Sequence, residues 1–278
     1  MREKTSLKKL RKEQYDHHSN VMPFLNDWKN NPYTFIKARF YMEMSAILVY
    51  FLLRVKAKPN TITILYALCG VIGGLMFSMP FKSSVLVALF IFFTKGILDW
   101  SDGHLARHTG TTSFTGHILD VYGAHLNEIG FYLGLGFYIF NFSDYSYIIY
   151  ILPLYPFLVA INLIVYSKMV ILNELISGKK TLNTDNKSRT EHNKIDLSKS
   201  TRLIKEFFNS FLDSRARTVD LICLIVLLEF TYDYNVSFYI FILLIIKHII
   251  IFIGSLFYVL NPNWSTEIIN KISSNNQL

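Results

Sequence analysis

The sequence predicts an all-α, polytopic membrane protein with six transmembrane helices and additional amphipathic helices at the membrane surface. Hydrophobic residues make up 51% of the 278 residues, and the mean hydropathy is +0.31. The apolar residues form blocks that are long enough to cross a bilayer as helices, and most of the segments between them are short. Six spans are expected, at about residues 61–79, 84–105, 115–141, 146–171, 217–232 and 236–260.

Two parts precede the first span. Residues 1–39 are polar and basic, and we expect them to form a cytosolic segment. Residues 40–57 are largely apolar, but Glu43 interrupts the stretch and basic residues such as Arg54 close it. This stretch is too short and too amphipathic for an additional span, so it is predicted to be an interfacial helix on the membrane surface.

The predicted membrane domain covers residues 58–262 and contains one long cytosolic loop at residues 173–216. In the second part of this loop apolar residues recur at helical spacing, which predicts another surface helix. These apolar residues are Leu203, Ile204, Phe207, Phe208, Phe211 and Leu212. The last residues, 263–278, are expected to form a cytosolic tail.

The basic residues predict the orientation of the spans. Twelve Lys and Arg residues lie among the first sixty positions and ten lie within 174–217, whereas the turns at 80–83, 142–145 and 233–235 contain only Lys82. Because basic residues favour the cytosolic side, both termini and the long loop should face the cytosol. The basic residues that give the net charge of +8 flank the spans, where they favour anionic membrane lipids. Nucleic acid is therefore not an expected partner.

Three carboxylates, Asp99, Asp102 and Asp120, stand near the predicted cytosolic ends of the second and third spans. Asp99 and Asp102 are three residues apart, so a helix places them on one face, where they repel unless a cation or a proton separates them. A hard divalent ion, Mg2+ or Mn2+, fits such oxygen ligands. Gly103 lets a ligand approach the backbone, and Arg107 offers a guanidinium for a phosphate. The pattern predicts a metal site for a phosphorylated substrate.

Residues 99–120, called the signature segment below, resemble the signature of the CDP-alcohol phosphotransferases, also named CDP-alcohol phosphatidyltransferases. The family pattern is D-x2-D-G-x2-A-R-x8-G-x3-D-x3-D, and seven of its eight fixed positions match. The matching residues are Asp99, Asp102, Gly103, Ala106, Arg107, Gly116 and Asp120. In addition, Pro59-Asn60 with Thr63 is similar to the Pro-Asn-x-x-Thr opening of the family's first membrane helix.

The resemblance implies a membrane enzyme that transfers a phosphoalcohol group from a CDP-alcohol to an alcohol or lipid acceptor in phospholipid synthesis, with release of CMP. It implies that Mg2+ or Mn2+ is held by Asp99, Asp102 and Asp120. The CDP pocket is expected to be formed by Asn60, Asp99, Gly103, Ala106, Arg107 and Gly116. Asn60 is explained equally well as part of a helix start. Family members often form homodimers.

The family's last Asp is replaced here by Ala124, and in the family that residue is thought to ligate metal and to act as general base. Glu128 lies one helical turn beyond Ala124 on nearly the same face, and its side chain can point back toward the metal site. His125 has a suitable proton affinity but lies about 100° around the helix. Glu128 is equally well explained by a buried ion pair with Lys247 of the sixth span.

Four questions stay open at this point. A catalytically impaired family member would bind a CDP-lipid or nucleotide without turnover. A cation transporter would also carry acids in its spans, but it would not need Gly103, Ala106 and Arg107 at these spacings. Arg215 and Arg217, before the fifth span, are either membrane anchors or ligands for an acceptor phosphate. The motif serves CDP-diacylglycerol with a polar acceptor as well as a CDP-linked head group with a diacylglycerol acceptor.

Overall fold

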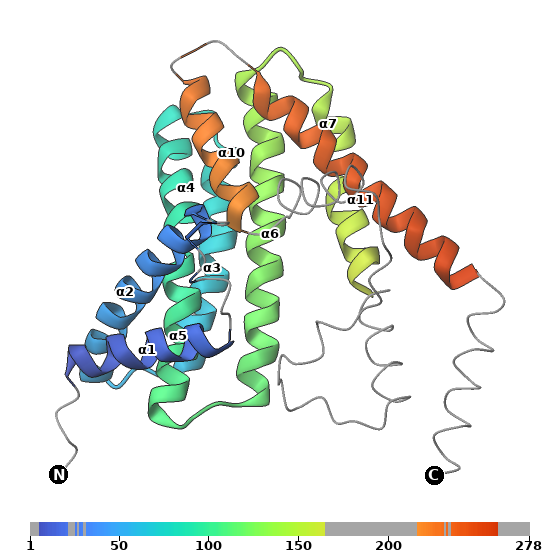
Figure 1. The fold of residues 1–278 in the computed structure, drawn as a ribbon. Helices are drawn as coiled ribbons and strands as arrows, with labels where there is room; N and C mark the ends of the chain where they lie inside the picture. The colour runs from blue at the N-terminus through green and yellow to red at the C-terminus, as the bar shows by residue number, and fades with distance from the viewer. Residues whose placement is uncertain are drawn as a thin grey trace, which may run out of the picture.

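The computed structural model describes residues 6–21, 26, 28–29, 32–164, 216–230, 232 and 235–260. These residues form helices and turns and contain no strand, which confirms the predicted all-α class (Figure 1). The surface helix predicted after Thr201, the tail at 263–278, Arg215 and the side chain of Arg217 lie outside the described residues. The loop 173–216 also lies outside them, apart from its last residue, which begins a helix.

The signature segment is carried by two helices that follow each other along the chain. They are α5 (Gly96–Thr109) and α6 (Phe114–Phe142), and they follow α3 (Pro59–Ser78) and α4 (Lys82–Thr94). Gly110 ends α5 in the left-handed conformation, with φ of 66°, which a residue without a side chain adopts at little cost. Ser113 then caps α6, because its side chain accepts a hydrogen bond from the backbone N–H of Gly116 at 3.0 Å.

Three helical stretches among the described residues are long and apolar enough to cross a membrane: Pro59–Ser78, Lys82–Thr109 and Val236–Leu256. The last belongs to α11 (Val236–Leu260). The 29 residues of α6 would extend about 43 Å, enough to cross a bilayer, but this helix also carries polar side chains. The apolar helix Ile148–Ile164, which contains α7 (Ile148–Ile151), and α10 (Ala216–Glu229) are shorter. The chain is therefore a helical membrane protein, and the number of six spans stays a prediction.

The second predicted span is contained in the helical stretch Lys82–Thr109, which is divided at Lys95 into α4 and α5, although Lys95 keeps α-helical dihedral angles (φ −50°, ψ −32°). Lys95 is followed by Gly96, where a Cβ atom would come within 2.6 Å of the Tyr41 ring. Tyr41 in turn donates a hydrogen bond from its hydroxyl to the backbone oxygen of Phe93 at 3.2 Å. The close approach of this ring requires glycine at position 96.

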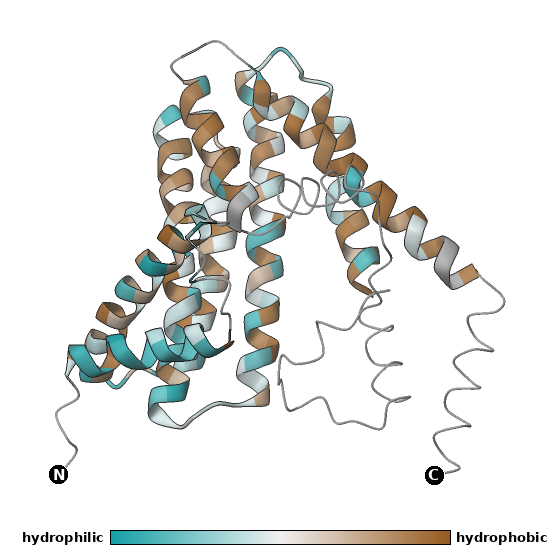
Figure 2. Ribbon diagram, viewed as in Figure 1, coloured by the Kyte–Doolittle hydropathy of each residue, from teal (hydrophilic) through white to brown (hydrophobic). Residues whose placement is uncertain are grey.

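The N-terminal region contains more structure than the sequence led us to expect. The interfacial helix expected at 40–57 is α2 (Pro32–Arg54), which begins eight residues earlier. A further helix, α1 (Leu7–Val21), lies within the segment that was expected only to be polar and basic. Although Figure 2 shows α1 as mostly hydrophilic, Leu10 and Gln14 are fully buried in it.

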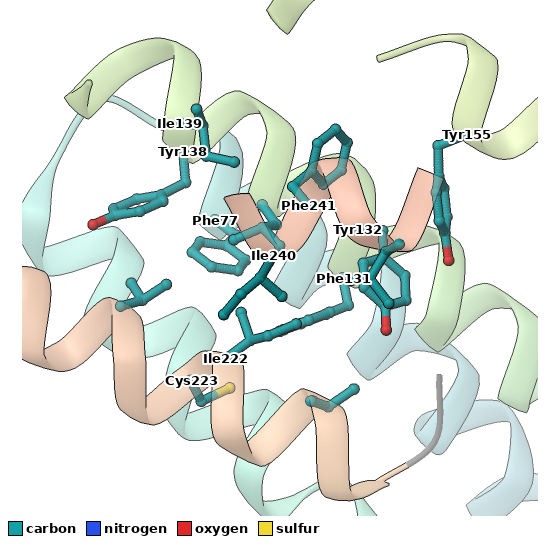
Figure 3. Packing of buried hydrophobic residues seen from close by; sticks show 14 of the residues in the cluster. Phe77, Phe131, Tyr132, Tyr138, Ile139, Tyr155, Ile222, Cys223, Ile240 and Phe241 are labelled. Atoms are coloured by element: carbon teal, nitrogen blue, oxygen red, sulfur yellow. The ribbon is translucent and has the colours of Figure 1, made fainter. Parts of the chain in front are cut away.

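The largest apolar core lies in the half of the molecule away from α1, where α3, α4, α6, α7, α10 and α11 meet (Figure 3). Phe77, Phe131 and Tyr132 are fully buried in it. A smaller cluster joins the other helices around the signature segment, and it consists of Leu10, Ala46, Val49, Ile62 and Leu105. The signature segment is thus supported by α1 and α2 as well as by the membrane helices.

Helices α3 and α6 are packed very closely through glycines. A Cβ on Gly70 would lie 2.5 Å from the Cα of Asn127, and one on Gly74 would lie 2.6 Å from the backbone oxygen of Gly130. Asn127 also donates from Nδ2 to the backbone oxygen of Tyr66 at 2.8 Å. The small residues of α3 thus allow close helix contact, which fixes α6 against the start of the membrane domain.

Candidate functional site

The structure brings Asp99 of α5 and Asp120 of α6 together. Their carboxyl groups lie within hydrogen-bonding reach of each other, and Asp102 adds to the negative potential at Asp99. The hydroxyl of Tyr66, from α3, also reaches the Asp99 carboxyl. Two neighbouring carboxylates repel each other unless a proton or a cation neutralises them.

Asp102 has a fixed orientation. Thr63 donates a hydrogen bond of 2.6 Å from Oγ1 to Oδ2 of Asp102, and the backbone N–H of Gly103 donates to Oδ1. The Asp102 side chain is buried, with 6% of its surface exposed. Thr63 is the Thr of the Pro-Asn-x-x-Thr opening, so the start of α3 and the signature segment meet directly.

Asn60 and Gly116 also lie together. A Cβ on Gly116 would be 3.2 Å from Oδ1 of Asn60 and 3.2 Å from Oγ of Ser113. A side chain at position 116 would therefore press on Asn60 and on the cap of α6. This contact gives a physical reason for glycine at this position of the signature segment.

Arg107 folds back over Gly103, since a Cβ on Gly103 would lie 3.1 Å from Nη1 of Arg107. Its Nη2 donates to Oε1 of Gln14 in α1 at 3.0 Å. Ala106 lies in the last turn of α5, where its backbone oxygen accepts a hydrogen bond of 2.9 Å from the N–H of Thr111. The guanidinium thus occupies the space over Gly103, and its remaining N–H groups can donate to a phosphate.

Lys95 lies one helical turn before Asp99. It acts on Asp99 electrostatically, and its Nζ lies 5.8 Å from the centre of the Tyr66 ring and 5.9 Å from that of Phe92. A cation over the faces of two aromatic rings is stabilised there. Lys95 is thus held where it faces the carboxylates from the start of α5.

At the position of the family's last Asp, Ala124 is exposed. Nδ1 of His125 and Oε2 of Glu128 are 3.7 Å apart, and Glu128 accepts a 3.5 Å contact from the Tyr155 hydroxyl. His248 lies within electrostatic reach of both Glu128 and Lys247, so these charges occupy one region of the helix bundle. Whether Glu128, His125 or neither takes the base's role stays a prediction.

The donor set fits a divalent ion in part. Asp99 and Asp120 present carboxylate oxygens from two helices to one place, which is the chemistry that Mg2+ and Mn2+ need. Asp102 is turned toward Thr63, and within the described part of the chain no three His, Cys, Asp or Glu side chains are grouped so that they could hold a metal. Asp99 and Asp120 would hold an ion directly, and Asp102 would add a third carboxylate in the orientation that Thr63 and Gly103 fix.

An apolar groove of about 310 Å³ runs between α3 and α6 beside this site. It begins at Thr63, the partner of Asp102, and continues along Ala67 and Val71. Leu119, Tyr122 and Leu126 form its α6 side. Leu119 directly precedes Asp120, so the groove leads from the carboxylates along the membrane helices.

Two contributors to the site were missed by sequence reasoning. Tyr66 lies one turn beyond Ile62 in an apolar helix, and nothing in the spacing sets it apart from the other aromatic residues. Gln14 lies in a polar segment 85 residues before Asp99, and the sequence gives no signal that it reaches Arg107. Both contacts depend on how distant helices cross.

Comparison with known proteins points to the same family as the residues of the signature segment. No curated protein and no solved structure matched the chain. Residues 56–179 match the family model described as CDP-alcohol phosphatidyltransferase, and this range contains α3 to α6 with the complete signature segment. Over these residues, which include Asp99, Asp102 and Asp120, the chain matches the CDP-alcohol phosphatidyltransferase family.

Proposed function

We propose that this protein transfers a phosphoalcohol group from a CDP-alcohol to an alcohol acceptor in phospholipid synthesis and releases CMP, with Mg2+ or Mn2+ as cofactor. The observation that supports this best is the meeting of Asp99 and Asp120, which lie on different helices. Arg107 and Gly103 lie next to Asp102 on the same helix, so groups for a metal and for a phosphate share one site.

In this proposal each residue acts on the nucleotide end of the donor. When bound, the divalent ion supplies positive charge for the phosphates of the donor and for the leaving CMP. Arg107 binds a phosphate oxygen with the N–H groups that point away from Gln14. Asn60 and Gly116 shape the opposite wall, where the starts of α3 and α6 meet.

The acceptor hydroxyl must lose a proton when its oxygen attacks phosphorus. Ala124 has no group that can take this proton, so Glu128 or His125 is proposed to receive it, directly or through water. The two side chains lie near each other, at 3.7 Å, and one of them could orient the other. Lipid substrate is proposed to enter from the side, with an acyl chain in the apolar groove between α3 and α6.

A second candidate function is favoured by Ala124. A protein that has kept the donor site but lacks the last Asp would bind a CDP-lipid or nucleotide without turnover. The basic residues before α3 favour a site that faces the cytosol, where soluble nucleotides are found. A homodimer is compatible with either candidate.

The test measures CMP release by the purified protein with Mg2+ or Mn2+ over a panel of CDP-alcohols and acceptors. Asp102→Asn and Ala124→Asp are the informative variants. If the wild type releases CMP and the Asp102→Asn substitution abolishes this release, the transferase function is supported. A silent wild type, with activity gained in Ala124→Asp, would support the binding protein. Silence of all three proteins together with no CMP binding would contradict both candidates.

A further inference from the structure

Helix α1 precedes the family-matched range 56–179, yet it carries a buried polar side chain that reaches the signature segment. Gln14 is fully buried. Its Nε2 donates to Oγ of Ser45 in α2 at 3.1 Å and approaches the backbone oxygen of Trp100 in α5 at 3.5 Å. Its Oε1 accepts from Nη2 of Arg107 at 3.0 Å. One amide thus connects three helices.

The contact with Arg107 fixes a side chain that would otherwise be free to rotate. Arg107 lies in the last turn of α5, and its long side chain has many rotamers in water. The acceptor oxygen of Gln14 holds one end of the guanidinium, and the missing side chain of Gly103 leaves room for the other. An arginine has five N–H donors, so the others stay available for a ligand.

Further contacts hold α1 against α5 in the same register. The ring of His18 stacks on Trp100, with centroids 4.2 Å apart and an angle of 25° between the planes. Nδ1 of His108 lies 2.7 Å from Oε2 of Glu13. Leu10, Gln14 and His18 follow each other at intervals of four residues and therefore share one face of α1.

We propose that α1 is part of the nucleotide site and that Gln14 is a positioning residue for Arg107. It holds the guanidinium in the orientation that binds a phosphate of the CDP group. The inference rests on the proposed function, because it assumes that Arg107 meets a nucleotide. A packing role alone would be met by an apolar side chain of the same size, whereas this position carries an amide whose donor and acceptor are both used.

The test compares Gln14→Leu with Arg11→Ala in the full-length protein. Arg11 lies on the same helix but pairs with the exposed Glu43 of α2 at 2.7 Å, so its removal disturbs α1 without touching Arg107. In Gln14→Leu we expect the Kd for CMP and the KM for a CDP-alcohol to rise about tenfold, with kcat nearly unchanged. Arg11→Ala should leave all three values near those of the wild type. Gln14→Met replaces Gln14→Leu if the latter does not fold.

A double variant shows whether the effect passes through Arg107. In an Arg107→Ala background, Gln14→Leu should cause no further loss of CMP binding. An equal loss in both backgrounds, or a Kd for CMP that Gln14→Leu does not change, would overturn the proposed positioning role. A wild type that binds no CMP would contradict the proposed function as well, so the two failures are distinguishable.

Discussion

Thr63 and Asp102 are joined by a hydrogen bond of 2.6 Å that connects the first membrane helix to the signature segment. The hydroxyl of Thr63 also contacts the backbone oxygen of Pro59 one turn earlier at 3.3 Å. The opening of α3 therefore has two roles, since it begins a helix and orients a carboxylate. This relationship ties the Pro-Asn-x-x-Thr motif to the aspartates by a direct contact.

Replacing Thr63 by Val tests this hydrogen bond, because valine keeps the shape and removes the hydroxyl. We expect CMP release to fall about tenfold, since the Asp102 carboxylate loses a charge-assisted bond that fixes its orientation. Thr61→Val, at an exposed position of the same helix, is the matched control. Equal rates for the two variants would show that Thr63 does not orient Asp102.

Replacing Asp120 by Asn tests whether its carboxylate repels that of Asp99. In the absence of metal the variant should unfold about 2–4 °C above the wild type, because one of two adjacent negative charges is gone. Added Mg2+ or Mn2+ should raise the Tm of the wild type and not that of the variant. Thermal unfolding with chelator and with metal measures both effects.

Glu43→Gln is the control for that experiment, since Glu43 is an exposed carboxylate paired with Arg11. It should respond to metal as the wild type does. A variant at position 120 that Mg2+ stabilises as strongly as the wild type would contradict a metal site at Asp120.

The docking of α1 is expected to weaken as the pH falls. Burial, together with the positive charges of His17 and Arg107, lowers the pKa of His18 from 6.5 to about 3. Below pH 6.5 His18 binds a proton when α1 is undocked but stays neutral when α1 is docked. Docking is therefore strongest above pH 6.5 and weakens progressively toward pH 3. The undocking equilibrium should shift by less than tenfold per pH unit, because His18 is only partly shielded from water.

Hydrogen exchange of α1 at pH 7.5 and pH 5.5 measures this change. Neither ring nitrogen of His18 has a hydrogen-bond partner among the described residues. His18→Phe should therefore keep the stacking on Trp100 and reduce the pH dependence without loosening the helix at pH 7.5. Equal pH dependence in the variant and the wild type would show that other groups, such as His17, control docking.

Sequence reasoning predicted the parts of the fold that depend on local pattern. The all-α class, the positions of α3 and α11, and the meeting of two helices at the signature segment follow from apolar blocks and short turns. The packing of Tyr41 of α2 against Gly96 was not predicted. A contact made by a distant side chain leaves no periodic signal in the sequence around it.

The candidate site was predicted to a similar extent. Motif spacing identified Asp99 and Asp120, and helical geometry explains why they can meet. The role of α1 could not be predicted, because its composition is polar and its burial is limited to a few side chains such as Gln14. Polar helices normally face solvent, and only tertiary contacts reveal the exceptions.

Replacing Gly130 by Ala tests the close contact between α3 and α6 that sets the geometry of the whole site. A Cβ at position 130 would lie 2.2 Å from the backbone oxygen of Gly70, and backbone atoms cannot rotate away as a side chain can. We expect the free energy of unfolding to fall by about 1–3 kcal/mol, as for other overpacked contacts. CMP release should fall as well, because α6 must move away from α3 and carries Asp120 with it.

Gly254→Ala is the matched control for this substitution. Position 254 also lies in a long apolar helix, α11, but a Cβ there would meet no atom within 4 Å among the described residues. Alanine favours a helix more than glycine does, so this variant should be as stable as the wild type or more stable. If thermal unfolding in detergent gave the two variants equal stability, the α3–α6 contact would be looser than its glycines indicate, and the site would tolerate movement of α6.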